Sequence, residues 1–406
     1  MLEQAKKLSS VLSRLRRDFH RYPELGFQET RTAQSVCETL QEIGGISIKS
    51  GIGKTGVIGE MGNGEGPTIA IRADMDALPI QEIGDANVIS KNKGVMHACG
   101  HDAHIAILLG VAMLLKERFA LEQLPGKVRF IFQPAEECFD EEGVSGASRL
   151  IEEGALENVD AIIALHVDST KPTGIVSICP QWVFAAVDTF KAWITASGGH
   201  GATPHLATDP IWMLNPVLTA LYGIVSRKID PMKKAVLSIG KLHAGTANNV
   251  IPHEVYLEGT LRSFEEGIRK QLIKNVEQAL SVVRPLGGDY RLKIVHGYPA
   301  SWNDPTVTAG LIKVCQVLIG ADYVNNEAMG MRSEDFAYMS QKIPGAIFLL
   351  GSAIPGGVER DHHTNVFDID ESVLPIGSAI LAESARRFLK GDLPIPVKTN
   401  HFSKTP

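Results

Sequence analysis

The sequence lacks a surplus of positive charge, because 40 Lys and Arg residues face 46 Asp and Glu residues and the net charge is -6. Proteins that bind nucleic acid usually carry a basic surplus, so we expect no nucleic-acid partner. Long apolar runs are missing too: the longest, from Ile105 to Leu115, is well short of the ~20 residues that cross a bilayer. The N-terminal residues mix charged and apolar side chains at helical spacing, unlike a signal peptide. We therefore expect a cytoplasmic protein without a membrane partner.

Cysteine is scarce and odd in number. The five cysteines are widely spaced along the chain: Cys37, Cys99, Cys138, Cys179 and Cys315. A disulfide framework is unexpected in a chain of this length, and reduced thiols in the cytoplasm fit the pattern better.

Several catalytic and nucleotide-binding signatures are also missing. The sequence contains neither G-x-S-x-G nor H-E-x-x-H, so serine-hydrolase and zincin mechanisms lack their motifs. The segment from Gly51 to Thr55 is similar to the end of a phosphate-binding loop. However, Ile48 stands where the first glycine is required, and a strand is predicted where a helix must follow. Nucleotide binding is therefore not expected.

The pattern of apolar residues predicts two domains. Short apolar runs alternate with helical patterns up to residue 181 and again after residue 299, which is typical of an α/β domain with a mixed, largely parallel sheet flanked by helices. Between them, four strand patterns and two helical patterns occupy about 115 residues, as in a small α+β domain of the ferredoxin-like kind. We predict a catalytic domain formed by residues 1–181 and 299–406, with residues 182–298 inserted into it.

The first candidate site is the histidine-rich segment from His97 to His104. Cys99 and His101 lie two residues apart with Gly100 between them. A thiolate and an imidazole this close can enter the coordination sphere of one metal ion, and Asp102 is placed to orient a ligand. The alternative is a polar turn between a strand and a helix.

Further candidate ligands follow apolar strands elsewhere. Glu136 and Glu137 come directly after one strand and His166 ends another, at the positions where ligands gather in open α/β sheets. One of the paired carboxylates can bind a metal while the other acts as a general base. Alone, the pair is equally typical of a solvated acidic turn. With His362 and His363, the set exceeds the needs of one tetrahedral ion and favours a two-metal site.

The inserted segment has polar groups of its own. His200, Asn249 and Arg262 are donors of the kind that stabilise an oxyanion or hold a substrate carboxylate. Loop chemistry is the alternative for His200, because the Gly-Gly and Thr-Pro pairs around it form turns in any protein.

Taken together, these motifs resemble the M20 metallopeptidase family, and most of all its amidohydrolase branch of aminoacylases, hippurate hydrolases and indole-acetyl-amino-acid hydrolases. The resemblance extends from Arg17 to about Leu389. Its motifs occur in the family's order: Arg17-x-x-His20-x-x-Pro23-Glu24, Arg72 to Pro79, His97 to Asp102, Gln133 to Glu137, Gly199-His200, Asn249 to Pro252, Ser333 to Phe336, and His363-Thr364.

The resemblance implies a cofactor and a set of ligands. Two divalent ions per subunit, of zinc, manganese or cobalt, are expected, with Cys99 a candidate to bridge them. Glu136 matches the general base. His363 is preferred over His362 because His363-Thr-Asn-Val-Phe367 fits the family's H-[ST]-x-x-F. The implied metal ligands are Cys99, His101, Glu137, His166 and His363.

The same resemblance implies an activity. The expected reaction is hydrolysis of the amide bond of an N-acyl amino acid, and a carboxypeptidase or dipeptidase is the alternative. His200 is expected to stabilise the oxyanion, while Asn249 and Arg262 hold the substrate carboxylate. The inserted domain is expected to be a lid that forms a homodimer, through which His200 and Asn249 reach the neighbouring subunit's site. One departure from the family concerns the longer, acidic stretch from Cys138 to Gly143, which leaves the charge of the pocket open.

Overall fold

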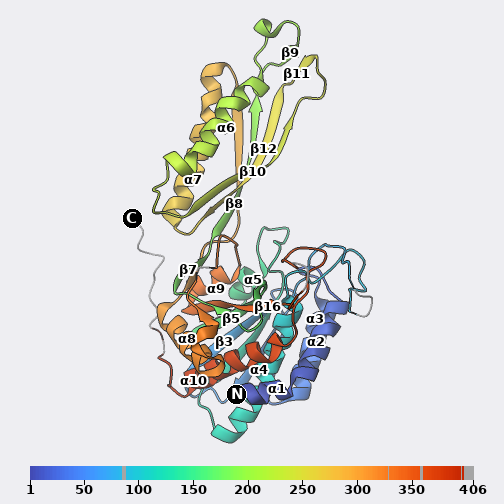
Figure 1. The fold of residues 1–406 in the computed structure, drawn as a ribbon, viewed down its shortest axis with the longest axis vertical. Coiled ribbons are helices and arrows are strands. Elements are labelled where there is room, and N and C mark those ends of the chain that lie inside the picture. The colour runs from blue at the N-terminus through green and yellow to red at the C-terminus, as the bar shows by residue number, and fades with distance from the viewer. Residues whose placement is uncertain (85–87, 328, 357–359, 395, 397–406) are drawn as a thin grey trace. The chain divides into compact units, whose positions relative to one another are not determined.

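The computed structural model describes residues 1–84, 88–327, 329–356, 360–394 and 396. The chain forms two compact units (Figure 1). Unit 1 contains Met1–Val183, Trp302–Met329 and the described residues from Asp335 onward, and unit 2 contains Phe184–Ser301 and Gly330–Glu334. All five cysteines are free.

Unit 1 is built on one eight-stranded sheet with the order β1-β2-β4-β3-β5-β16-β6-β15. Four neighbouring pairs are parallel, namely β4–β3, β3–β5, β5–β16 and β6–β15, and the other three are antiparallel. The strands are β1 (Ser47–Ile52), β2 (Gly56–Gly62), β3 (Thr68–Asp74), β4 (Lys127–Gln133), β5 (Ala161–Pro172), β6 (Val176–Ser177), β15 (Val324–Asn325) and β16 (Gly345–Ala353).

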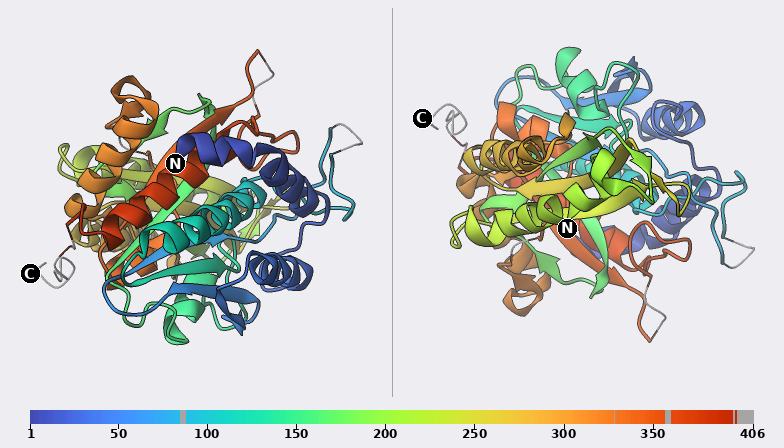
Figure 2. Two further views of the ribbon diagram at one scale, coloured as in Figure 1. Left: turned by 90° about the horizontal axis from the view of Figure 1, so that it is seen from below. Right: turned by 90° about the horizontal axis from the view of Figure 1, so that it is seen from above.

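Helices cover this sheet, and the core lies between them and the central strands. Every residue of β3 is buried, and α4 is buried along most of its length. The helices α4 and α10 pack side by side against the central strands (Figure 2). The helices of unit 1 are α1 (Leu2–Lys7), α2 (Ser9–Arg21), α3 (Thr30–Ile43), α4 (His101–Glu122), α5 (Gly146–Glu152), α8 (Pro305–Ile319), α9 (Phe336–Lys342) and α10 (Val373–Leu389).

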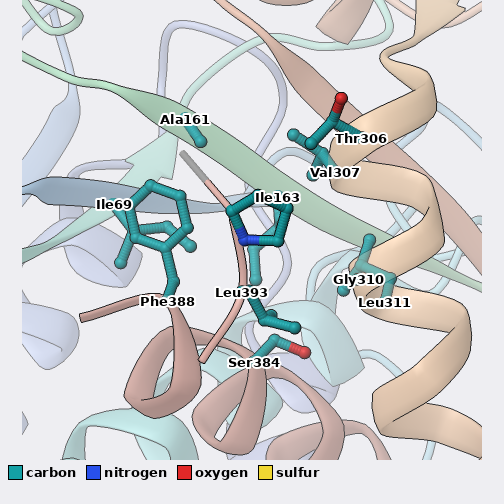
Figure 3. Close-up of a pocket in the computed structure, with 11 residues that line it drawn as sticks. Ile69, Ala161, Ile163, Thr306, Val307, Gly310, Leu311, Ser384, Phe388 and Leu393 are labelled. Atoms are coloured by element: carbon teal, nitrogen blue, oxygen red, sulfur yellow. The ribbon is translucent and has the colours of Figure 1, made fainter. Parts of the chain in front are cut away.

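The parallel strands place the candidate site at the carboxyl ends of the central strands. Asp74 at the end of β3 is the register partner of Gln133 at the end of β4. The loops that follow these strands therefore leave the sheet together, at the end where α/β sheets bind ligands. Near the opposite ends of β3 and β5, by Ile69 and Ala161, a cavity of about 20 Å³ lies among side chains of α8 and α10 (Figure 3). Its lining is mostly apolar, so it belongs to the core.

Unit 2 is a four-stranded antiparallel sheet, β10-β12-β8-β13, packed against two helices. Its β-α-β-β-α-β order and strand arrangement are those of a ferredoxin-like domain. The Asp209 side chain accepts from the backbone N–H groups of Ile211 and Trp212 and so caps α6. The elements are β8 (Ala186–Thr195), α6 (Pro210–Arg227), β10 (Ala235–Ala244), β12 (Glu254–Ser263), α7 (Glu266–Leu280) and β13 (Asp289–His296).

The remaining elements are short. They are the strands β7 (Gln181–Phe184), β9 (Gly199–His200), β11 (Val250–Ile251) and β14 (Ser301–Asn303), and the 3-10 helices Pro204–Leu206, Ser281–Leu286 and Ala321–Tyr323.

The predicted fold class is confirmed: a mixed α/β domain accompanies a small ferredoxin-like α+β domain. The sequence pattern did not reveal the seven-residue helices α5 and α9, because two helical turns are too short to show a clear period. Among the described helices, none combines the length and the apolar character that crossing a bilayer requires.

Candidate metal centre

The five predicted metal ligands lie together in unit 1. The ligand atoms of Cys99, His101 and His166 lie within 4.8 Å of one another, and so do those of Cys99, Glu137 and His363. The Cys99 Sγ is 3.4 Å from the His166 Nε2, and the His363 Nε2 is 2.8 Å from the Glu137 Oε1. Cys99 belongs to both groups. Its thiol therefore lies where two ions could share it as a ligand.

Gly100 allows Cys99 to come close to the middle of β5, which continues to Pro172 and does not end at His166 as the sequence predicted. Gly100 precedes α4 and has a φ of +90°, a conformation that favours glycine. A Cβ at this position would lie 2.3 Å from the Val167 Cγ2. Any larger residue would therefore push His166, the neighbour of Val167, away from the thiol.

Two of the histidines have one ring nitrogen fixed by the backbone. The Nδ1 of His101 donates to the carbonyl oxygen of Asp76 at 2.8 Å, and the Nδ1 of His166 donates to that of Val167 at 2.7 Å. In the neutral ring, each Nε2 then carries the lone pair that a metal ligand needs. The Nε2 of His101 is buried and has no hydrogen-bond partner among the described residues. Burial lowers the pKa of His101, but Asp74 and Asp76 outweigh it and raise that pKa to about 10, so a cation at this Nε2 would take the place of a proton.

The chemistry of the thiol fits a cation as well. Burial, together with the carboxylates of Glu137 and Glu136, raises the pKa of Cys99 well above its usual value. The protein groups around the sulfur therefore disfavour the thiolate, and a positive charge is needed to stabilise it. Two carboxylates beside a thiol and three imidazoles form a donor set that suits borderline-soft divalent ions.

A tight turn presents both glutamates to this cluster. The turn contains Ala135, whose φ of +45° is unusual for a residue other than glycine. The N–H groups of Glu136 and Glu137 donate to the two carboxylate oxygens of Asp76, at 3.0 and 2.9 Å. Glu136 is buried, and one of its oxygens lies within 4.8 Å of the ligand atoms of His101 and Glu137. It is thus beside the ligands without belonging to either group that contains Cys99.

A buried chain of charges lies behind the ligands. Asp74 accepts from Arg72 at 2.6 Å and from the Nδ1 of His104 at 2.5 Å, while the Nε2 of His104 accepts from the Val167 N–H at 3.0 Å. Burial raises the pKa of Asp74, but Arg72, His101 and His104 outweigh it and hold that pKa well below the usual range. Asp74 therefore stays ionised and, through His104, holds the middle of β5 beside the site.

The structure corrects the role suggested for Asp102. Its carboxylate accepts from the Arg16 Nε and from the His20 Nδ1, both at 2.8 Å, so it does not orient a metal ligand. Asp76 does so instead, since its backbone oxygen binds His101 and its carboxylate oxygens bind the glutamate turn. The sequence offers one signal for Asp76, namely its position directly after the buried strand β3.

His362, the alternative to His363, also lies near the thiol but belongs to neither group of ligand atoms. Its Nδ1 is 3.8 Å from the Cys99 Sγ, and its Nε2 accepts from the Ser169 N–H at 3.4 Å. The preference for His363 as the ligand remains a prediction.

The acidic stretch after the glutamates is largely neutralised. Asp140 bonds to Lys54 and to Arg149, each at 2.7 Å, and Arg149 also bonds to Glu142 at 2.5 Å. These bonds hold the pKa of Asp140 below its usual value, the bond to Lys54 most of all. The stretch therefore adds less negative charge than its sequence suggests.

The three residues predicted to contact substrate all lie in unit 2. His200 on β9 pairs with Val250 on β11, and Asn249 directly precedes that strand, so the two-stranded ribbon brings His200 and Asn249 together. Both residues are exposed. Arg262 lies on β12 and donates to the Ser333 Oγ at 3.1 Å.

Comparisons with known proteins show which family this chain belongs to. The profile of the peptidase family M20/M25/M40 matches residues 70–387. Thermostable carboxypeptidase 2 of Saccharolobus solfataricus is 38% identical over 388 residues, which cover 94% of this chain and 96% of the relative. N-acetyl-L-cysteine deacetylase of Bacillus subtilis is 39% identical over 387 residues, or 94% of this chain and 89% of the relative.

Solved structures give the same result. The crystal structure of the Bacillus subtilis YXEP protein, described as a dinuclear metal binding peptidase from the M20 family, is 35% identical with a TM-score of 0.80. The match covers 95% of this chain and 99% of that chain. The chain therefore belongs to the M20 peptidase family.

Proposed function

We propose that this protein hydrolyses the amide bond of N-acyl amino acids and releases a carboxylic acid and a free amino acid. The observation that carries the proposal is the thiol of Cys99 shared by two groups of ligand atoms, with the buried carboxylate of Glu136 beside them. The proposed cofactors are two divalent ions of zinc, manganese or cobalt. Their proposed ligands are Cys99, His101, Glu137, His166 and His363.

Each step of the reaction is assigned to particular residues of the chain. When bound, the ions supply positive charge that polarises the scissile carbonyl and lowers the pKa of the attacking water. Glu136 accepts a proton from that water and later passes it to the nitrogen of the leaving amine. His200 donates to the oxyanion. Asn249 and Arg262 bind the free carboxylate of the amino acid, for which a guanidinium is the best-matched partner.

The domain roles are part of the proposal. Residues 1–181 and 299–406 supply the catalytic domain, and residues 182–298 form a lid whose closure excludes water. The lid also forms a homodimer in the cytoplasm, so that His200 and Asn249 serve the neighbouring subunit. The exposure of both residues on the β9–β11 ribbon supports this role.

A second candidate activity is cleavage of short peptides from a free C-terminus. The relative named thermostable carboxypeptidase 2, 38% identical to this chain, favours it. The same metal ligands and the same general base serve both reactions, since each breaks an amide bond next to a carboxylate.

A parallel hydrolysis screen decides between the two. Acetyl-, benzoyl- and indole-acetyl-amino acids are compared with dipeptides, and metal content is measured on the same sample. We expect faster turnover of N-acyl amino acids, inactivation by a chelator, and recovery with Zn²⁺, Mn²⁺ or Co²⁺. Each good substrate is paired with its C-terminal amide, which lacks the carboxylate and is expected to react poorly. Faster turnover of dipeptides contradicts the first proposal, and full activity after complete removal of metal contradicts both.

A further inference from the structure

The turn that carries both glutamates requires a restraint beyond the metal ligands. Ala135 has a φ of +45°, a conformation that L-residues adopt only when the surroundings enforce it. Only with this turn do the side chains of Glu136 and Glu137 leave the backbone in the directions that the site needs. The question is which groups hold the turn.

Two buried carboxylates bind the three successive N–H groups of the turn. Asp76 accepts from Glu136 and Glu137, as described above, and Glu29 accepts from the Ala135 N–H with its Oε1 at 2.8 Å. Asp76 also contacts the ligand His101. The bonds of the Glu29 side chain go instead to the turn and to Thr55. Glu29 is therefore the member of the pair whose effect on the turn can be tested separately.

Glu29 is itself firmly held. It directly precedes α3, its side chain is 0% exposed, and its Oε2 accepts from the Thr55 Oγ1 at 2.5 Å. The preceding loop also presses on the turn, because a Cβ at Gly26 would lie 3.1 Å from the Ala135 Cα. The acceptor oxygen thus has little freedom to move away from the Ala135 N–H.

Thr55 belongs to the segment that resembles a phosphate-binding loop. In the structure this segment is the turn between β1 and β2. Thr55 binds Glu29, and the adjacent Lys54 binds Asp140, three residues after Glu137. The segment is therefore connected to the glutamate turn indirectly, through Glu29 and through Asp140.

We propose that Glu29 is a positioning residue for the general base, and that the turn from Gly53 to Thr55 holds Glu29 in place for this role. Through the N–H of Ala135, Glu29 fixes the direction in which Glu136 leaves the backbone. The inference rests on the proposed function, since it concerns the residue assigned there as the base. It assigns a role to the lysine-threonine segment, for which nucleotide binding is not expected.

The test compares two substitutions at this position. Glu29→Ala removes the acceptor for the Ala135 N–H, whereas Glu29→Gln keeps a carbonyl oxygen at the same place. Both variants are loaded with the same metal, and kcat, KM, metal content and melting temperature are measured with the best substrate of the unmodified protein. A displacement of the base by about 1 Å can cost roughly 100-fold in rate. We expect Glu29→Ala to lower kcat by about 10- to 100-fold, with KM and metal content little changed, and Glu29→Gln to restore most of the kcat.

Glu60→Ala is the control. Glu60 is a partly buried carboxylate on β2 and accepts from the Arg129 Nε at 2.8 Å. Its bonds go to Arg129 and Lys127 and reach neither the Gly53–Thr55 turn nor Glu29. We expect this variant to keep the kcat of the unmodified protein.

Three results overturn the inference: an unchanged kcat in folded, metal-loaded Glu29→Ala, a Glu29→Gln variant as slow as Glu29→Ala, or an equal loss in the Glu60→Ala control. If Glu29→Ala does not fold, Thr55→Val replaces it, with an expected loss in kcat of about 3- to 10-fold, and an unchanged kcat contradicts the inference. Failure of the proposed function is seen separately, as lack of N-acyl amino acid hydrolysis by the unmodified protein. The ratio between variants is then measured on the dipeptide that this protein cleaves.

Discussion

Replacing Arg16 with methionine tests the buried charges behind the metal centre. Arg16 is 2% exposed and donates to the fully buried Asp102 at 2.8 Å and to Asp368 at 3.1 Å. Methionine keeps an unbranched, apolar stem but leaves Asp102 with His20 as its remaining charged partner. Breaking a buried pair in this way costs ~3–5 kcal/mol. Since 1 kcal/mol shifts the melting temperature of a large domain by ~2–4 °C, we expect a loss of roughly 6–20 °C.

The next residue provides the control. Arg17 is 51% exposed and bonds to Glu371 at 2.8 Å, and a surface ion pair is worth only ~0–1 kcal/mol. Arg17→Met is therefore expected to shift the melting temperature by less than about 4 °C. Both variants are melted by calorimetry in the metal-loaded state, at pH 8 and at pH 5. An equal loss in the two variants refutes the reasoning.

The pH dependence of the Arg16→Met deficit has a definite sign. Burial raises the pKa of Asp102, but Arg16 and then His20 outweigh it and hold that pKa below its usual range. Without Arg16 the pKa rises, so Asp102 takes up a proton more readily as the pH falls. Protonation removes the unpaired buried charge. The deficit relative to the unmodified protein is therefore expected to be larger at pH 8 than at pH 5, and the opposite order contradicts this account.

Two further predictions concern the glutamate turn. A Cβ at Gly146 would lie 1.6 Å from the carbonyl oxygen of Pro134. Gly146→Ala should therefore abolish turnover and lower the melting temperature. The control is Gly267→Ala in α7, which has open space around it and should change stability by no more than ~1 kcal/mol. Burial, and next the charge of Asp76, raises the pKa of Glu29 from 4.5 to about 7. The unmodified metal-free protein should therefore lose up to ~3 kcal/mol relative to Glu29→Gln as the pH rises from 4.5 through 7. Urea midpoints measure this difference, and a value independent of pH contradicts it.

The sequence predicts the long, periodic elements well. The amphipathic stripe that begins at Thr30 and the Gly44-Gly45 pair that follows Ile43 predict a helix over these residues, and α3 has these bounds in the structure. The sheet is mixed, as expected, but the sequence does not show which strands run antiparallel: β1, β2 and β6 do so with neighbours. Strand direction depends on how loops route the chain, and apolar periodicity does not record it.

The candidate ligands could be chosen from the sequence because their residue types and positions after strands are local features. The supporting residues could not. Asp76 and Glu29 act on backbone N–H groups 60 and 106 residues further along the chain, and such pairings exist only in the fold. The same holds for the neutralisation of Asp140 by Lys54, which no inspection of the acidic stretch alone predicts.

Glu136→Gln, measured for turnover and for metal content on one sample, tests directly whether Glu136 is the general base. Glutamine keeps the shape of the side chain but cannot accept the proton, and a positioned general base contributes ~10²–10⁴-fold to a rate. We expect a fall in kcat of that size for the best substrate, with metal content equal to that of the unmodified protein. Turnover within a few-fold of the unmodified protein, or loss of a metal ion from the variant, contradicts the role of Glu136 as the general base.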